Sequence, residues 1–404
     1  MRILFVAMAN SIHTCRWVNQ VTDQGWDVHL FPIESAGIHP SFKNVTVHEL
    51  LYQRPPGLSP STRVKGIKWP FRKGINVGYY ALENLRKSCT MVDRVHRLAT
   101  TVRRLKPDII QSLEIQHAGY LTLDAKNIHG GKFPPWIVTN WGNDIYLFGR
   151  LAEHVDRIKE VLASCDYYSC ECHRDVQLGK QMGFRGEVLP VLPNAGGFDL
   201  DHVSQLRQPG PTSSRKLILL KGYQDWHGRA LVGLRAIELC ANELKGYRVG
   251  IYVANADIKI AAELVSKSTG IPINIIPYCS HDDMLRQYGH ARVYIGLGIS
   301  DGISISELEA IVMGAFPIQS CTACADEWIT DGETGFIVPP EDPEPIAAAL
   351  RQAVSDDALV DRAAALNTQL ARERLDQALI KPQVIAMYEK IAAQSKKKKE
   401  LANL

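Results

Sequence analysis

The sequence predicts an α/β protein of two doubly wound domains, each a parallel β-sheet covered by helices on both faces. Three observations support this fold class. Short apolar runs alternate with helical patterns, as parallel strands joined by crossover helices require. The alternation stops once, near residues 193–197, and then starts again. The chain also has 404 residues, which exceeds the usual size of a single hydrophobic core.

The first half of the chain supplies the elements of the first domain. Its apolar runs predict strands at residues 3–9, 28–31, 108–112 and 136–139. Helical patterns predict a helix at 14–24, ended by Gly25, and a long basic helix at 91–105. A turn of sequence Trp141-Gly142-Asn143-Asp144 follows the last of these strands.

The second half repeats the alternation after a polar stretch at 201–215, where Pro209-Gly210-Pro211 predicts an interdomain linker. Strands are predicted at 216–220, 248–253, 273–276, 293–297 and 316–319, and helices at 230–241, 258–268, 282–290 and 307–314. We therefore expect domains at 1–198 and 199–379, with a ligand cleft between the carboxyl ends of their sheets. An apolar stripe at helical spacing predicts a last helix at about 380–394, which we expect to pack back on the first domain.

Composition excludes several classes of protein. With 46% hydrophobic and 22% charged residues, the chain is typical of a soluble globular protein. No stretch approaches the ~20 apolar residues that cross a bilayer, and the first residues lack the pattern of a signal peptide, so we expect a cytoplasmic protein. Its nine cysteines, an odd number, indicate reduced thiols rather than a disulfide framework. The pairs Cys170/Cys172 and Cys321/Cys324 lack the partners of a zinc site.

Positive charge is concentrated in one region. Between Arg54 and Lys106 there are thirteen lysines and arginines against two acids, although the net charge of the whole chain is only +3. The mixture of cations and aromatic residues at 64–73 favours an anionic membrane surface, so we expect peripheral docking at the inner face of the membrane. A solvated helix face is the alternative. No nucleic-acid module accompanies the region, and we expect no nucleic-acid partner.

The segment 300–314 has the clearest chemical pattern. It follows a predicted strand and opens a predicted helix, and its small residues Gly302 and Ser304 let backbone N–H groups approach a ligand. Because a helix N-terminus attracts anions, this segment predicts a phosphate site. A second interpretation is equally compatible with the residues: Ser306-x-x-Glu309 is a capping box, in which Glu309 holds the backbone.

The same segment resembles the Glu-x7-Glu motif of the family-four, retaining glycosyltransferases of the GT-B fold, with Asp301 in place of the first glutamate and Glu309 as the second. Further resemblances occur in the family's order along the chain. They are the opening strand and helix of 1–33, the turn at 141–144, the junction Pro193-Asn194-Ala195-Gly196-Gly197-Phe198-Asp199, and the stretch 326–338.

The resemblance implies the roles of the donor site. The amides of Gly302, Ile303, Ser304 and Ile305 would hold the diphosphate of a nucleotide sugar, Glu309 would bond the ribose hydroxyls, and Asp301 would lie beside the transferred sugar. The cationic residues that bind the donor diphosphate in the family occupy shifted positions in this sequence. The candidates for binding the diphosphate are therefore Lys221 and Arg229, followed by His227. Tyr278 is the candidate for contact with the nucleotide base, together with Cys279 and Asp283. The alternative for Asp283 is that it caps the following helix. No cofactor and no divalent metal are expected.

For the first domain, the candidates for catalysis are His117 and Asp144, and Ser11, His13 and Asn143 are expected to line the cleft. Each has a structural alternative: a lone histidine is often a satisfied structural residue, and Asp144 could fix its own turn. The implied activity is retaining transfer of a sugar to a glycan or glycolipid, in the biosynthesis of cell-surface polysaccharide. Two alternatives remain open, a non-catalytic scaffold subunit that binds sugar nucleotide and a GT-B-fold sugar-nucleotide epimerase.

Overall fold

The computed structural model describes residues 1–68 and 93–402. These residues form two compact units, Met1–Gly196 with Lys381–Leu404, and Gly197–Ile380. They are called unit 1 and unit 2 below. Part of the basic region, including Arg72, Lys73, Arg86 and Lys87, lies outside the described residues.

Unit 1 contains an eight-stranded sheet whose described pairings are all parallel, in the order β4-β3-β2-β1-β5-β6-β7-β8. The strands are β1 (Arg2–Ala7), β2 (Asp27–Pro32), β3 (Thr46–Tyr52), β4 (Arg63–Lys68), β5 (Ile109–Leu113), β6 (Trp136–Thr139), β7 (Tyr167–Ser169) and β8 (Glu187–Val188). Strands β5 and β6 are buried along their whole length, which explains why they appear in the sequence as continuous apolar runs.

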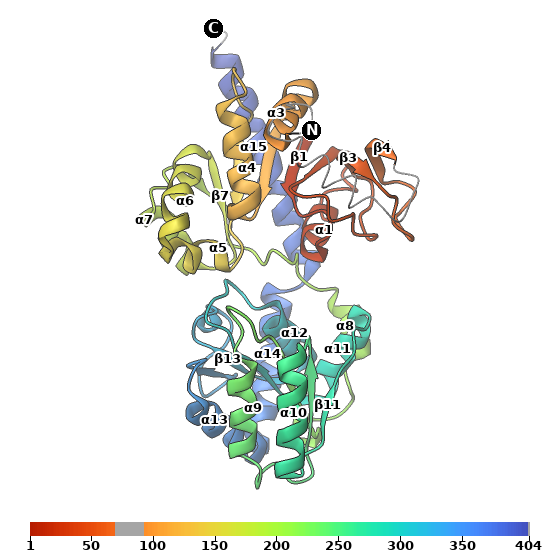
Figure 1. Cartoon of the computed structure of the whole chain (residues 1–404), viewed down its shortest axis with the longest axis vertical. Coiled ribbons are helices and arrows are strands. Elements are labelled where there is room, and N and C mark those ends of the chain that lie inside the picture. The colour runs from red at the N-terminus through yellow and green to blue at the C-terminus, as the bar shows by residue number, and fades with distance from the viewer. Residues whose placement is uncertain (69–92, 403–404) are drawn as a thin grey trace. The chain divides into compact units, whose positions relative to one another are not determined.

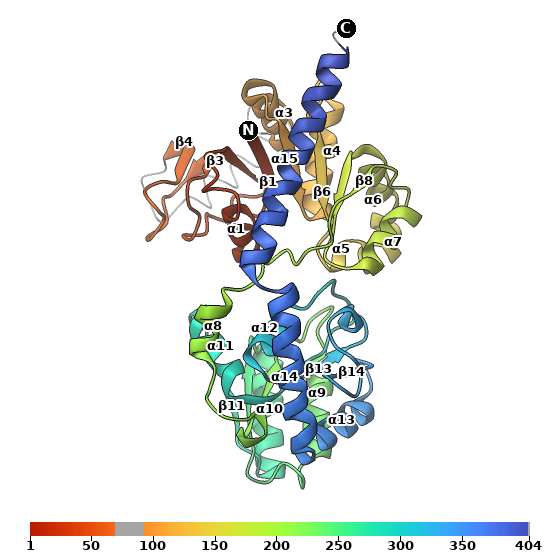
Figure 2. The ribbon, with the colours of Figure 1, turned by 180° about the vertical axis from the view of Figure 1, so that it is seen from behind.

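Helices cover this sheet on both faces (Figures 1 and 2). The helical elements are α1 (Ile12–Asn19), α3 (Arg94–Leu105), the π-helical turn η1 (Ile115–Gly119), α4 (Tyr120–Asn127), α5 (Asn143–Tyr146), η2 (Phe148–Arg150), α6 (Ala152–Ser164) and α7 (His173–Gln181). Helices α3, α4 and α6 share a core with β1, β5 and β6. The predicted helix at 14–24 is shorter and starts earlier than expected, because Ser11 caps it.

The long C-terminal helix α15 (Gln377–Ala402) completes unit 1 on the other face. Figure 2 shows it running along β1 and α1. The Trp17 indole N–H donates to the Tyr388 hydroxyl at 3.0 Å, and that hydroxyl donates to Gln111. Nearer the end of the helix, the Tyr167 hydroxyl donates to Gln394 at 2.8 Å, and Lys390 pairs with Glu187 at 2.6 Å. Helix α15 therefore bonds to elements from the whole length of unit 1, from α1 to β8.

Unit 2 contains a six-stranded sheet, again with parallel pairings, in the order β11-β10-β9-β12-β13-β14. The strands are β9 (Leu217–Lys221), β10 (Arg248–Tyr252), β11 (Ile273–Ile275), β12 (Ala291–Gly296), β13 (Phe316–Ser320) and β14 (Phe336–Val338). The helices are α8 (Leu200–Leu206), η3 (Thr212–Ser214), α9 (Ala230–Leu239), α10 (Ala256–Thr269), α11 (His281–His290), α12 (Ile305–Met313), η4 (Ala325–Glu327), α13 (Pro343–Ser355) and α14 (Asp357–Arg374).

Helices α9, α10 and α13 cover one face of the second sheet, and α8, α11, α12 and α14 cover the other (Figure 1). Each strand order reverses next to the first strand of its unit, at β1/β5 in unit 1 and at β9/β12 in unit 2. The predicted fold class, two doubly wound parallel sheets, is confirmed. No helix among the described residues is both long enough and apolar enough to cross a membrane.

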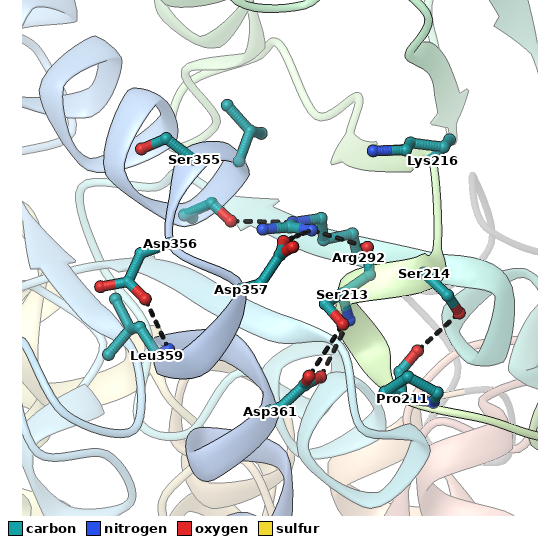
Figure 3. Close-up of polar contacts among 12 residues, drawn as sticks. Pro211, Ser213, Ser214, Lys216, Arg292, Ser355, Asp356, Asp357, Leu359 and Asp361 are labelled. Carbon is teal, nitrogen blue, oxygen red and sulfur yellow. Dashed lines mark hydrogen bonds and ion pairs between the residues drawn. The ribbon is translucent and has the colours of Figure 1, made fainter.

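The predicted interdomain linker at 201–215 is wrong. The chain passes between units at Gly196 and Gly197, whose φ angles of 79° and 76° favour glycine. The polar stretch instead belongs to unit 2, where Ser213 is bonded to helix α14 and to strand β12 (Figure 3). Ser213 bonds to Asp361 through its amide at 2.9 Å and its hydroxyl at 2.8 Å, and buried Arg292 donates to the Ser213 carbonyl at 2.7 Å. Proline and glycine predicted a loop correctly but could not reveal these anchors.

Candidate functional site

Two neighbouring strands of unit 2, β9 and β12, end side by side and carry several of the candidate site residues. The loop after β9 pairs with the loop after β12 through an antiparallel bridge between Gly228 and Gly298. The Ile299 amide donates to the His227 carbonyl at 2.9 Å, and the Arg229 amide donates to the Leu297 carbonyl at 3.2 Å. This pairing brings the predicted cations onto the same edge as the segment 300–304.

The loop after β9 depends on glycine because its backbone passes very close to its neighbours. A Cβ atom at Gly228 would lie 2.3 Å from the Tyr223 carbonyl oxygen, and one at Gly222 would lie 2.7 Å from the Tyr252 carbonyl oxygen. The Gly222 amide donates to that Tyr252 carbonyl at 2.8 Å, which ties the loop to β10. The position of the cations is therefore set by the backbone.

The three predicted cations lie together, although each already has a neighbour. Lys221 ends β9, with its ammonium 4.7 Å from the centre of the Tyr223 ring. Arg229 forms a 3.0 Å ion pair with Glu341. The His227 Nδ1 atom lies 2.8 Å from Asp225, yet burial lowers the pKa of His227, and the charges of Lys221 and Arg229 lower it further. We expect a neutral His227 beside two permanent cations at neutral pH.

Helix α12 begins with uncapped amides. Its N-cap residue is Ser304, which makes no side-chain capping hydrogen bond, and the first N–H groups of a helix have no partner within the helix. The helix thus starts at Ile305, two residues earlier than predicted. Ser306 lies inside it, so the capping-box interpretation of Ser306 and Glu309 is wrong. The amides of Ser304 and Ile305 can face an anion, as the phosphate interpretation requires.

Glu309 lies one turn into α12 and is nearly buried. Its carboxylate accepts from His281 Nε2 of α11 at 2.8 Å. Charged hydrogen bonds of this kind orient a carboxylate, and Glu309 is thereby fixed at the helix start rather than bonded to the backbone. His281 was not among the predicted site residues, and its only signal in the sequence is its place at the start of a predicted helix.

Two further carboxyl groups lie in the same loop. Asp301 accepts the Gly302 amide at 2.9 Å, and the Asp301 amide donates to the Thr322 carbonyl at 3.2 Å. Glu307, in the first turn of α12, is 0% exposed, and neither carboxyl oxygen has a hydrogen-bond partner in the described structure. Burial, with the charges of Asp301 and Asp326 beside it, raises the pKa of Glu307 well above its usual value. A protonated Glu307 is therefore expected.

A cluster of buried tyrosines supports this loop from behind. The hydroxyls of Tyr252 and Tyr288 lie 2.7 Å apart, and the ring of Tyr288 is 5.7 Å from that of Tyr294. Ser306 contacts this pair, since it lowers the pKa of each hydroxyl while burial raises it. This cluster could not be found from the sequence, because its members come from β10, α11 and β12 and have no shared motif.

The residues proposed for the base have different surroundings. Tyr278 is fully exposed. Asp283 takes part in capping α11: its amide donates to Ser280 Oγ at 3.1 Å, and that hydroxyl donates back to the Asp283 carboxylate at 2.6 Å. The geometry thus favours the capping alternative for Asp283, while Tyr278 has a free face for a ring.

In unit 1, the carboxyl end of β5 carries a strained glutamate. Glu114 has φ 81°, which is unusual for a residue with a side chain, and it is the N-cap of η1. Its carboxylate accepts the amides of His117, at 2.9 Å, and of Ala118. Strained backbone and π-helical turns are both common at functional sites. Glu114 was not predicted, although a charged residue directly after a buried strand is a signal that could have found it.

The same carboxylate sets the state of His117. The imidazole Nδ1 lies 3.1 Å from Glu114, and this contact raises the pKa of His117, with a smaller contribution in the same direction from the charge of Glu34. The side chain is 72% exposed. His117 therefore presents a titratable positive charge to solvent at the carboxyl edge of the first sheet.

Asp144 is buried and fully engaged. Its Oδ2 atom accepts the amides of Ile115 at 2.9 Å and Trp141 at 2.8 Å, so it joins the loops after β5 and β6. Burial, followed by the charge of Glu114, raises the pKa of Asp144 well above its usual value. These contacts favour the alternative that Asp144 fixes its own turn, and they also position the segment that carries His117.

The remaining candidates of unit 1 lie near this turn. Ser11 is the N-cap of α1 and accepts the Thr14 amide at 3.4 Å. His13 is exposed, and its ring is 6.4 Å from that of Trp141 in an edge-to-face arrangement. The buried side-chain oxygen of Asn143 has no partner in the described structure. The ring contact places His13 beside Trp141, two residues before Asn143, while the hydroxyl of Ser11 is used by its helix.

Two family models match the chain, one in each half. Residues 2–164 match the model described as glycosyl transferase 4-like, and residues 262–370 match the model described as glycosyl transferases group 1. Among curated proteins, none matches the sequence.

Solved structures share the fold over nearly the whole chain. Sucrose-phosphate synthase from Thermosynechococcus elongatus has 15% identity and a TM-score of 0.69, covering 98% of this chain and 100% of that one. HepE of Anabaena, in complex with UDP-glucose, has 13% identity and a TM-score of 0.67, covering 96% and 100%. The α,α-trehalose 6-phosphate synthase from Burkholderia multivorans has 14% identity and a TM-score of 0.67, covering 98% and 99%.

The matched structures share the two-sheet fold described above. The two family models match the chain in the order that its own motifs predict. The chain belongs to the GT4-type glycosyltransferases and has their GT-B fold.

Proposed function

We propose that the protein is a retaining, metal-independent glycosyltransferase that moves a sugar from a nucleotide-sugar donor to a glycan or glycolipid in the biosynthesis of cell-surface polysaccharide. One observation carries the donor part of this proposal: the loop after β9, which follows Lys221 and carries Arg229, is bridged to the loop after β12 that leads into the uncapped start of α12. The complex of HepE with UDP-glucose supports a donor of the same class.

The donor site would work through charge. The amides of 302–305 and the side chains of Lys221 and Arg229 would bind the diphosphate, while Glu309 would accept from the ribose hydroxyls. The positive charge of these amides, Lys221 and Arg229 would stabilise the diphosphate as it leaves. Electrostatic stabilisation of this kind is the main source of rate enhancement in such sites. Because the cations and amides already compensate this charge, the proposal needs no divalent metal.

The transfer step would proceed on one face of the sugar. The acceptor hydroxyl oxygen forms a bond to the anomeric carbon as the bond from that carbon to the diphosphate oxygen breaks. The acceptor proton passes to the departing diphosphate, so no protein base is required. Asp301 would lie beside the transferred sugar, and its shorter side chain would reach less far than a glutamate. His117 would supply positive charge on the acceptor side.

A cavity in unit 1 suits an acceptor. It has a volume of about 630 Å³ and lies where β1, β2 and β3 end, with Arg54 and Lys68 in its lining. Ligand sites in doubly wound folds occur at this edge of a sheet. Arg54 already donates to three carbonyl oxygens, of Thr62, Leu58 and Ser59, so Lys68 is the better candidate to meet an acidic group of the acceptor.

Thermal unfolding with a panel of UDP-, GDP-, ADP- and CMP-sugars tests the donor proposal, since a ligand raises stability by RT ln(1 + [L]/Kd). We expect the sugars of one nucleotide to raise the unfolding temperature. Lys221→Gln should raise the apparent Kd for that donor at least tenfold. The exposed Lys245→Gln is the matched control.

Equal turnover with and without a chelator supports metal independence. Donor binding without hydrolysis or transfer would instead support the scaffold alternative.

We also propose that the protein associates with the inner face of the membrane through the basic region between Arg54 and Lys106. Flotation with liposomes tests this. Recovery should be greater with anionic lipid than with neutral lipid, and equal recovery from both would contradict the proposal.

A further inference from the structure

A second cavity lies at the opposite edge of the sheet in unit 1. It has a volume of about 500 Å³, within the usual range of small-ligand sites. Its lining includes Pro107, Pro135 and Asp166, which stand just before β5, β6 and β7. In contrast, the candidates His117 and Asp144 follow the carboxyl ends of β5 and β6. This amino-edge cavity is therefore separate from the proposed transferase site.

The cavity combines cations with apolar surface. Arg103, Lys106 and Lys132 contribute positive charge, and Phe133 and Tyr167 contribute aromatic rings. The Arg103 guanidinium donates only to neutral oxygens in the described structure, the His129 carbonyl and the Thr100 hydroxyl, both at 3.2 Å. No acidic partner of Lys106 or Lys132 is found among residues 1–68 and 93–402. These three charges are available to a ligand.

The one acid in the described lining offers little compensation. Asp166 accepts the Trp136 amide at 2.9 Å, so part of its charge is already used at the start of β6. The Tyr167 hydroxyl donates to Gln394 and is likewise engaged. The lining as a whole is thus positive, and it favours an anion that also has an apolar part.

Helix α15 also reaches this cavity. Ser395 lines the cavity, and the exposed Lys396 and Lys397 follow it directly along the helix. Lys106 is held at the C-terminus of α3 in a left-handed conformation, with φ 49°, and its amide donates to the Val102 carbonyl at 2.8 Å. Two segments far apart in the sequence, the end of α3 and helix α15, therefore meet at the same cavity.

We propose that the amino-edge cavity binds the phosphate head of an anionic lipid and so holds unit 1 on a membrane surface. Clusters of lysine and arginine near a membrane surface attract anionic headgroups. The apolar lining would contact the glycerol and first methylene groups of the lipid. The inference rests on the proposed membrane association but not on the transferase chemistry, and it assigns that association to one cavity.

The test compares full-length variants in binding to vesicles of phosphatidylcholine with or without phosphatidylglycerol. Lys106→Gln with Lys132→Gln should weaken binding to anionic vesicles at least tenfold. Ser395→Trp, which fills the cavity without changing charge, should weaken it at least fivefold. The matched control, Lys245→Gln with Lys259→Gln, removes two exposed lysines of unit 2 and should bind as the original protein does to within about twofold. Thermal unfolding verifies that each variant is folded.

The outcomes separate the two proposals. If the original protein binds neutral and anionic vesicles equally, membrane association itself is wrong. If it prefers anionic vesicles but Ser395→Trp binds equally well, the charge acts as a diffuse surface and the cavity assignment is overturned. If glycerol phosphate raises the unfolding temperature of the original protein but not of the double lysine variant, while no variant differs in vesicle binding, the cavity takes a soluble anion and the lipid assignment is overturned.

Discussion

The carboxyl edges of the two sheets are built from the same kind of strand ends but present different chemistry. In unit 2 the edge consists of closely packed backbone, an uncapped helix start and two permanent cations, Lys221 and Arg229. In unit 1 the corresponding edge presents His117, whose charge depends on pH and on a strained Glu114. Under the proposed function, anion binding would be set by the backbone in unit 2 and by titratable side chains in unit 1.

The largest effect is expected at Glu309. Under the proposed function, its replacement by alanine removes charged hydrogen bonds to the donor ribose and the contact with His281, at ~1.5–3 kcal/mol each. We expect kcat/KM for the donor to fall about 100-fold, which corresponds to ~2.7 kcal/mol. Steady-state kinetics measure this. Glu263→Ala, which removes an exposed carboxylate on α10, is the control and should leave kcat/KM unchanged.

Gly228→Ala tests whether the backbone of unit 2 sets the site. The new Cβ atom would meet the Tyr223 carbonyl oxygen at 2.3 Å, and neither backbone segment can move without disturbing the bridge to Gly298. Overpacking of this kind costs ~1–3 kcal/mol. We expect a lower midpoint in denaturant unfolding and weaker donor binding. Gly131→Ala, with only His129 side-chain atoms at 3.9 Å, should change neither; equal behaviour of the two variants would contradict the argument.

Glu307→Gln tests the pH dependence of unit 2. The pKa of Glu307 is raised in the folded state, so the unfolded state releases its proton first as pH rises above ~4.3. The free energy of unfolding of the original protein therefore falls from that pH up to the folded-state pKa. The glutamine variant lacks this loss, so its stability relative to the original protein should be clearly greater at pH 8 than at pH 4. Urea unfolding at both pH values measures it; a constant difference would exclude a buried neutral acid.

The smallest effect is expected at His117. Its folded-state pKa is raised, so the Glu114–His117 contact contributes fully below the unfolded-state pKa and is lost as pH rises through the folded one. Because the imidazole is mostly exposed, we expect less than about 1 kcal/mol. In a histidine titration followed by NMR, Glu114→Gln should lower the pKa of His117 clearly and Glu34→Gln only slightly. The reverse order would show that His117 is not governed by its contact with Glu114.

Much of the fold could be predicted from the sequence because buried parallel strands are continuous apolar runs. Strands such as β6 have the predicted bounds. Strands β3 and β4 were missed, since only one face of β3 is buried and β4 is largely exposed. The stretch 201–215 was misread because side-chain anchors such as Ser213–Asp361 join residues far apart in sequence.

The part of the candidate site that is contiguous in the sequence could be predicted, and the part that depends on contacts between separate elements could not. The loop 300–309 could be found because its small residues, its helix start and Glu309 are contiguous. Its supports could not be found: His281, Glu307 and the tyrosine cluster depend on burial and on contacts between separate elements. For Glu307 in particular, nothing in an amphipathic pattern shows whether a carboxyl group in a first helical turn faces solvent or the interior.

Helix α15 has a consequence for the way the chain is made. Unit 1 combines residues that are synthesised before unit 2 with residues that are synthesised after it, because Tyr388 must reach Trp17 and Gln111 from beyond unit 2. The sheet of unit 1 thus acquires its contacts with α15 only after unit 2 has been made, while unit 2, contiguous from Gly197 to Ile380, can form earlier. A chain released before Tyr388 would leave the indole of Trp17 without its partner.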